Sequence, residues 1–470
     1  MRSKWYRFVL AMMVFNGHSL SHANNNHESP DFFQLDLAIE DTQPVGEKDN
    51  KQRWPVYGSL RFQSQYATQQ QLNNVAYSRQ NSELSQARTS LRLNFMAQVF
   101  ERVTIDMRGI ASYDVLYHYH RDNVSREEFD SFADELAIRD AHLQFETWDN
   151  LWFKFGRQVI AFGESDFTQI VDVVNPRDER EFGLVDLEDA RLPITATRLS
   201  YVGQRWGIDM VFSHEFEPNR NAGEGADFDR YITVRHQLRI DKQREPTVNF
   251  LRPGKLLRGF WSHAQGDINI VFAESVDQTP VLALSPRGDN YVDEVYPEVT
   301  TYGVSANWIT GHWLFKGEVA RKNNTFIPRR DTEQQLALGF GRGELFSEKD
   351  IVQTLIGLEY SAYQDIQLAT EITTTTILDY ETHLLPQKQE SILSSRVVFE
   401  FYRDTADVEI LWAHWLDVDS DSVRLTYNYE YSDEIQLSLG YIDFLSNDDD
   451  GPLYPYRNND RVFASMTYSF

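Results

Sequence analysis

The sequence predicts an all-β protein, an antiparallel transmembrane β-barrel of about 18 strands (roughly 16–18) with short periplasmic turns and long extracellular loops. Apolar and polar residues alternate along many segments, as in strands whose two faces meet different solvents. Short and long connections alternate between these segments, and aromatic residues lie near the segment ends. All three observations are typical of a barrel that crosses a membrane.

The end of the chain shows the alternation most clearly. Val462, Ala464, Met466, Tyr468 and Phe470 share one parity, and most of the residues between them are polar. A strand here would turn its apolar face to lipid and its polar face to the lumen. An aromatic residue at the end of such a strand resembles the signal that outer-membrane barrels present to the barrel-assembly machinery, so Phe470 is the expected assembly signal.

The remaining strands follow from the same alternation. Backbone groups in hydrocarbon have no water to bind, so the strands must pair around a closed ring. An even number of strands places Asn24 and Phe470 on the periplasmic side. The expected strands are 56–66, 87–99, 103–117, 136–147, 150–157, 195–203, 206–216, 257–264, 268–275, 300–308, 312–321, 352–361, 366–375, 392–402, 407–415, 422–431, 435–444 and 461–470.

The first residues have the features of a targeting segment. Arg2, Lys4 and Arg7 precede an apolar run over 8–15, and Ala23 ends a small-x-small cleavage site. Residues 1–23 are therefore expected to be a signal peptide that is cleaved near Ala23.

The chain that follows divides into two parts. Residues 24–52 are polar and acidic and are predicted to form a flexible periplasmic leader, and residues 53–470 are predicted to form the barrel in the bacterial outer membrane. Within the barrel domain, 158–194 is the most distinctive connection.

The composition limits the classes of partner. The formal net charge is −26, which argues against nucleic acid because affinity for a phosphate backbone requires a basic surface. The chain has no cysteine and needs no disulfide. Outer-membrane lipid, the assembly machinery and envelope transport components are the expected partners.

Strand parity assigns charged residues to the lumen in two groups. If distant strands face each other, one wall is basic and the other acidic, and the lumen carries a transverse field. Alternatively, the same residues pair with neighbouring strands and only solvate or plug the interior. The basic group is Arg61, Arg88, Arg92, Arg108, Lys154 and Arg198, and the acidic group is Glu318, Glu359, Glu371, Glu400, Glu409 and Glu430.

The connection 158–194 is too rich in apolar residues for a solvated loop, and it carries many paired charges. It either folds into the pore and narrows it, with Arg177, Arg180 and Arg191 bound to carboxylates, or caps the barrel mouth. The expected carboxylates are Asp172, Asp178, Glu188 or Asp189. The candidate gate residues are Arg157, Gln158, Gly163, Glu164, Asp172, Asn175, Pro176, Arg177, Asp178 and Arg191.

Three motifs in this connection carry a family resemblance: "GRQVIAFGES" from Gly156, "DVVNPRD" from Asp172 and "EDARLPI" from Glu188. They resemble consecutive motifs of a proteobacterial outer-membrane family catalogued as domain of unknown function 1302. The resemblance implies a large porin-like barrel. Phe162 stands where the family motif has Trp.

The expected function is an outer-membrane channel that passes or exports a small polar or amphipathic solute through a charged lumen narrowed by an inward loop. One alternative is an exporter of a polysaccharide or hydrophobic molecule that resembles the alginate-export barrels, and another is a structural barrel with a blocked lumen. No catalytic constellation is evident, so no enzyme activity is expected. His118 and His120 lack an evident third ligand, so neither a metal nor another cofactor is expected.

Overall fold

The computed structural model describes residues 56–69, 84–100, 102–185, 190–232, 234–235, 238–287, 291–330, 345–363, 365–402, 405–447 and 451–470. The predicted signal peptide (1–23) and leader (24–52) lie outside these ranges, as do Glu188 and Asp189.

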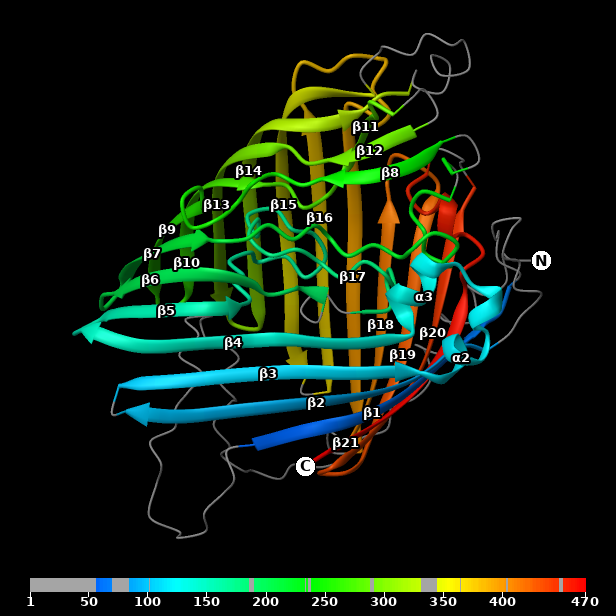
Figure 1. Ribbon diagram of the computed structural model, residues 1–470. Helices are drawn as coiled ribbons and strands as arrows, with labels where there is room; N and C mark the ends of the chain where they lie inside the picture. The colour runs from blue at the N-terminus through cyan, green and yellow to red at the C-terminus, as the bar shows by residue number, and fades with distance from the viewer. Residues whose placement is uncertain are drawn as a thin grey trace. The chain divides into compact units, whose positions relative to one another are not determined.

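The described strands form an 18-stranded antiparallel sheet, as predicted (Figure 1). Its strands are β1 (Val56–Ala67), β2 (Leu84–Phe100), β3 (Val103–Asp114), β4 (Asp134–Trp148), β5 (Leu151–Gln158), β6 (Ile194–Val202), β7 (Trp206–Ser213), β9 (Gly254–His263), β10 (Gly266–Val276), β13 (Glu298–Thr310), β14 (Trp313–Pro328), β15 (Phe346–Tyr363), β16 (Ile366–Ile377), β17 (Gln389–Phe401), β18 (Ala406–Trp415), β19 (Ser420–Ser432), β20 (Ile435–Ser446) and β21 (Arg461–Ser469).

The sheet closes on itself through its first and last strands. β1 pairs with β2 along one edge and with β21 along the other, where Ser59 lies opposite Ser469 and Ala67 lies opposite Arg461. Phe470 extends this seam by exchanging backbone hydrogen bonds with Gly58. The closed ring confirms the predicted barrel. Closure pairs the backbone N–H and C=O groups of the first and last strands, which lipid could not hydrogen-bond.

The outer surface carries the apolar face of this alternation. Large apolar side chains at every second position are exposed, as expected where hydrocarbon replaces water. Aromatic rings gather at the short turns, where Tyr201 contacts Trp206 and Trp313 contacts Tyr360. The exposed apolar residues include Phe62, Leu93, Met107, Ile208, Met210, Leu257, Ile270, Val304, Val319, Ile356, Leu368, Leu425, Leu439 and Met466.

The strand predicted over 103–117 is too long, because β3 ends at Asp114. The Asp114 side chain accepts hydrogen bonds from the backbone N–H groups of Leu116 and Tyr117, which starts α2 (Val115–Tyr119) instead. η2 (Arg121–Asn123) and α3 (Arg126–Phe132) complete the connection to β4.

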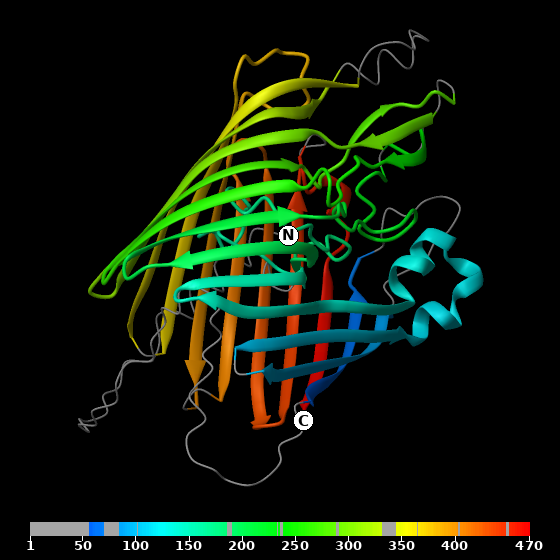
Figure 2. The same ribbon diagram turned by 60° about the vertical axis from the view of Figure 1, so that its left-hand side comes forward.

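Further elements lie at the same end of the barrel (Figures 1 and 2). β8 (Arg239–Arg244), β11 (Val281–Leu284) and β12 (Tyr291–Val295) form a small separate sheet within two long connections, and η3 (Tyr454–Tyr456) precedes β21. Over the described ranges, we find no helix with the length and apolar character needed to span a bilayer.

Candidate functional site

The described part of the connection between β5 and β6, residues 159–185 and 190–193, lies inside the ring of strands, where Figures 1 and 2 draw it in teal. We call it the inner loop. Its apolar residues Ile160, Phe162, Ile170, Val171 and Val174 are buried. They form one cluster with side chains from the inner wall, namely Ile194, Ala196, Val211, Leu256, Val271, Ala273, Ala320 and Leu355.

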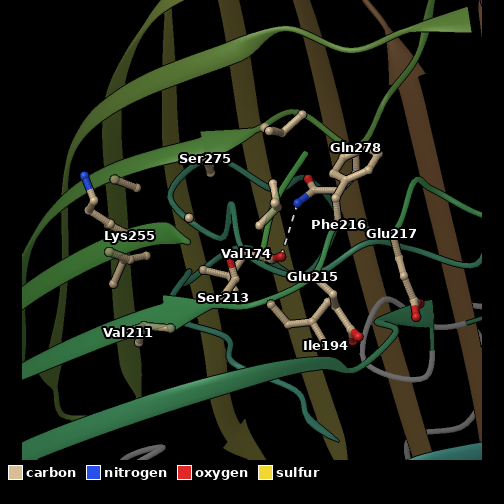
Figure 3. Close-up of a pocket in the computed structure, with 15 residues that line it drawn as sticks. Val174, Ile194, Val211, Ser213, Glu215, Phe216, Glu217, Lys255, Ser275 and Gln278 are labelled. Carbon is tan, nitrogen blue, oxygen red and sulfur yellow. Dashed lines mark hydrogen bonds between the residues drawn. The ribbon is translucent and has the colours of Figure 1, made fainter. Parts of the chain in front are cut away.

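One edge of this cluster is shown in Figure 3. Val174 of the inner loop lies beside Ile194 and Val211 of the wall. Gln278, which follows β10, donates a hydrogen bond of 3.1 Å from its Nε2 to the carbonyl oxygen of Val174. Apolar burial and this hydrogen bond from a side chain to the loop backbone together hold this part of the loop against the wall.

Asn175 connects the two ends of the inner loop. Its Oδ1 accepts a hydrogen bond of 2.7 Å from the backbone N–H of Ile160, and its Nδ2 donates one of 2.7 Å to the carbonyl oxygen of Leu192. The backbone N–H of Leu192 also donates to the carbonyl oxygen of Pro176. Ile160, Asn175 and Leu192 each belong to a different one of the three family motifs, so these hydrogen bonds join all three motifs.

A buried ion pair joins two of the same motifs. Nε of Arg191 lies 2.8 Å from Oδ2 of Asp172, whose side chain is almost fully buried. Burial raises the pKa of Asp172, and this effect outweighs the opposite one of Arg191. The pair is one of those predicted from the sequence, and it needs both partners because an unpaired buried charge is costly.

Two carboxylates of the wall fasten the middle of the loop. Glu318 of β14 accepts hydrogen bonds from the backbone N–H groups of Glu164, Ser165 and Val171. Glu371 of β16 accepts one of 2.9 Å from the hydroxyl of Ser165. These two residues were predicted to line the pore, and they point inward but lie beneath the loop, where both are buried.

The following part of the loop contacts the opposite wall. Glu181 accepts hydrogen bonds from Gln65, Gln86 and Arg88 of β1 and β2. Burial raises the pKa of Glu181, but Arg88 and the two amide donors outweigh burial and leave this pKa below its ordinary value. Because β1 and β2 lie about half-way around the closed sheet from β14, the loop crosses the lumen.

Phe162 covers a charged network on the wall. Its ring lies 5.3 Å from the guanidinium carbon of Arg198 and 4.6 Å from that of Arg258. Both arginines bind the buried carboxylate of Asp209. A flat ring over two guanidinium groups explains the need for an aromatic residue here, and it shields Arg198, predicted as pore-lining, from the open lumen.

Other predicted lumen residues pair with near neighbours. Arg108 contacts Asp106 and Asp140, and Arg88 binds the loop. Glu409 binds both Arg396 and Arg424.

The same holds on the acidic strands, where Lys316 contacts Glu359 and Glu371 and where Glu400 accepts a hydrogen bond from Gln367. Much of the charge on both predicted walls is thus locally compensated. The other predicted wall residues, which lie on β1, β2, β5 and β19, are Arg61, Arg92, Lys154 and Glu430.

The predicted gate residues do not all belong to the inner loop. Arg157 lies in β5 and binds Glu215 and Glu217 with distances of 2.8 Å and 2.9 Å. It shares the parity of Phe155, on the opposite face of β5 from the buried Gln158. Gln158 donates to the carbonyl oxygen of Ala196.

Asp178 binds Arg180, which is another of the pairs predicted from the sequence. Arg180 also reaches Glu135 at 3.0 Å, and Arg220 is 2.7 Å from the same Glu135. Glu135 was not among the predicted residues because the strand predicted over 136–147 begins one residue after it, whereas β4 begins at Asp134. A bulge at Arg139 also interrupts the alternation of β4. Gly163 lies against Glu318 and Asp172, where an added Cβ would be 3.4 Å from both side chains.

The described residues contain no cluster of His, Cys, Asp and Glu arranged to hold a metal ion. His118 contacts Asp134 at 3.0 Å and stacks on Tyr113.

Comparison with known proteins decides the family. A family model described as "Protein of unknown function (DUF1302)" matches residues 40–470. The chain belongs to this family. The predicted resemblance is therefore confirmed, and the motifs that carry it in this DUF1302 protein are those of the inner loop. No curated protein matches the chain.

Solved structures share the fold of this DUF1302 protein. OccAB3 of Acinetobacter baumannii has a TM-score of 0.51 at 10% identity, covering 88% of this chain and 99% of its own. OccAB1 of the same organism has a TM-score of 0.50 at 9% identity, with coverages of 88% and 96%. At this identity the likeness concerns the barrel fold alone.

Proposed function

We propose that the protein is an outer-membrane channel in which the inner loop narrows the lumen and selects polar solutes. The observation that carries this proposal is the fixed path of the loop across a closed barrel, from Glu318 on one wall to Arg88 on the other. A segment held at both walls reduces the cross-section without needing to move.

Charged groups beside the loop favour a water-filled passage. The side chains of Arg108 and Arg396 retain 39% and 44% of their exposure, and that of Glu359 retains 34%. These residues keep both signs of charge in contact with the lumen, which favours polar over apolar solutes. We therefore propose that the solute is a small polar molecule, and that it enters or leaves through the lumen by diffusion.

Planar-bilayer recording of the purified full chain tests the channel directly. We expect a stable, low conductance from the parent protein and a higher conductance after deletion of 164–188, because the deletion removes most of the inner loop. Heat-modifiable migration on gels provides the check that both proteins form barrels. A folded parent and a folded deletion variant that both fail to conduct would instead favour the structural barrel with a blocked lumen.

A further inference from the structure

A polar cavity of about 230 Å³ lies between the inner loop and the upper inner wall formed by β10, β13, β14 and β15. We call it the polar chamber. Ser275 and Gln278 border both this chamber and the apolar pocket of Figure 3. The polar chamber is therefore next to the region in which the apolar residues of the inner loop pack against the wall.

Two cationic side chains line the chamber, Arg177 from the inner loop and Lys322 from β14. Among the residues that the structure describes, neither makes an ion pair with a carboxylate. Burial lowers the pKa of Arg177, with Glu179 and Asp172 acting in the opposite direction, yet a guanidinium in a protein keeps its charge. Both cations are available to an anion that enters.

Buried polar atoms around the chamber also lack a protein partner. They are Oγ1 of Thr301 and Oε1 of Gln353, whereas the side-chain amide of Gln169 lies beside the carboxylate of Asp172 and acts to lower the pKa of that carboxylate. Thr301 is fully buried. Since buried polar groups are normally hydrogen-bonded, this set of donors and acceptors matches a solute with hydroxyl groups.

Three carboxylates also line the chamber, and each has a contact of its own. Asp172 binds Arg191, Glu179 accepts a hydrogen bond from Asn219, and Asp277 accepts one from the backbone of Thr279. Asp172 and Glu179 also act on Arg177, and Asp277 acts on Lys322, across the chamber. Arg177 and Lys322 are nevertheless its two cationic groups.

We propose that the polar chamber binds a small hydroxylated carboxylate, with its carboxylate between Arg177 and Lys322 and its hydroxyl groups on Thr301 and Gln353. Charge-assisted hydrogen bonds to two cations hold the anion more strongly than neutral ones hold an alcohol. The chamber's role as a solute site on a transport path rests on the proposed channel function, but binding itself does not.

Isothermal titration calorimetry of the detergent-solubilised full chain tests binding without requiring conduction. The probe is sodium gluconate, and glucose and glucosamine serve as the neutral and cationic comparisons. We expect gluconate to bind and glucose to bind at least tenfold more weakly. Arg177→Gln and Lys322→Gln should each weaken gluconate binding by about 5- to 30-fold, which corresponds to about 1–2 kcal/mol.

Lys255→Gln is the matched control, because Lys255 is also a lysine on the barrel wall but is 55% exposed and bound to Glu274. It should bind gluconate like the parent. Equal binding of gluconate and glucose, stronger binding of glucosamine, or no binding by the heat-modifiable parent would overturn the inference. A parent that conducts ions without binding gluconate overturns only this site, whereas one that binds gluconate without conducting overturns only the channel.

Discussion

Gly303 on β13 and Val171 on the inner loop are in direct contact: a Cβ atom at position 303 would lie 2.6 Å from Cγ1 of Val171. Gly303 faces the lumen beside Ala320, so the absence of a side chain makes the space into which the loop packs. The wall and the loop are therefore fitted to each other at this point.

Gly303→Ala should push the inner loop away from the wall. Overpacking of this kind costs about 1–3 kcal/mol, enough to populate a displaced loop. We expect larger current fluctuations in bilayer recordings, with the barrel still heat-modifiable. Gly259→Ala is the control, because no atom lies within 4 Å of a Cβ built there; identical recordings from the two variants would show that Val171 does not fix the loop.

Asn175→Ala should loosen both ends of the inner loop. The substitution leaves the backbone N–H of Ile160 and the carbonyl of Leu192 without their partner, at about 1–3 kcal/mol for each buried group. We expect faster proteolysis within 159–193, mapped by mass spectrometry. Asn447→Ala should not change it, because Asn447 is exposed and binds only Asp419 among the described residues; protease resistance equal to the parent's would contradict the role of Asn175.

The barrel could be predicted because each strand has one apolar and one polar face, which appear in the sequence as alternating apolar and polar residues. All the predicted strands occur, since lipid and lumen demand different residues at alternate positions. Strand ends were less predictable: β14 continues to Pro328, beyond the predicted end at 321, and β3 stops early at the Asp114 cap. Where strands rise above the membrane, the lipid no longer imposes alternation.

The inner loop could be recognised from the sequence, but its contacts with the barrel wall could not be predicted. Its length and motifs indicated a structured segment, and the pair Asp172–Arg191 was among those expected. The contacts with Glu318 and Gly303 depend on how far each strand is shifted against the next, which residue types alone do not specify. The role of Phe162 likewise depends on its contact with Arg258, which is far away in the chain and could not be paired with it from the sequence.

The topology can be tested on a clean background, because the sequence contains no cysteine. Asn123 is exposed in η2 on the long-connection side, and Asp149 is exposed in the short turn between β4 and β5. We expect Asn123→Cys to react with a membrane-impermeant maleimide on intact cells and Asp149→Cys to react only after lysis. The reverse labelling pattern would show that the barrel has the opposite orientation in the membrane.

Removal of Phe470 should impair assembly. Its backbone N–H and carbonyl each form a hydrogen bond of 2.9 Å with Gly58, and the residue is 53% exposed. We expect less heat-modifiable protein in the outer-membrane fraction and more in the periplasm. Phe470→Tyr preserves an aromatic ring and should assemble normally; equal assembly of the deletion variant would remove Phe470 from the insertion signal.

Asp460 should make the seam between β20 and β21 sensitive to pH. Burial, followed by a hydrogen bond with Asp443, raises the pKa of Asp460 to about 7. The backbone N–H of Phe444 donates to the same carboxyl group at 2.9 Å. Because the folded protein holds this proton more tightly than the unfolded chain, stability is highest below pH about 4 and falls as the pH rises to about 7.

Asp460→Asn keeps an acceptor for Phe444 and removes the titration. We expect its heat-modification temperature to exceed the parent's by several degrees at pH 8, and this advantage to shrink steadily as the pH is lowered to 5. Asp130→Asn serves as the control, since Asp130 is 65% exposed and, among the residues that the structure describes, forms an ion pair only with Arg126 across one helical turn. A difference between parent and Asp460→Asn that is the same at both pH values would mean that the buried carboxyl group does not take up a proton when the barrel closes.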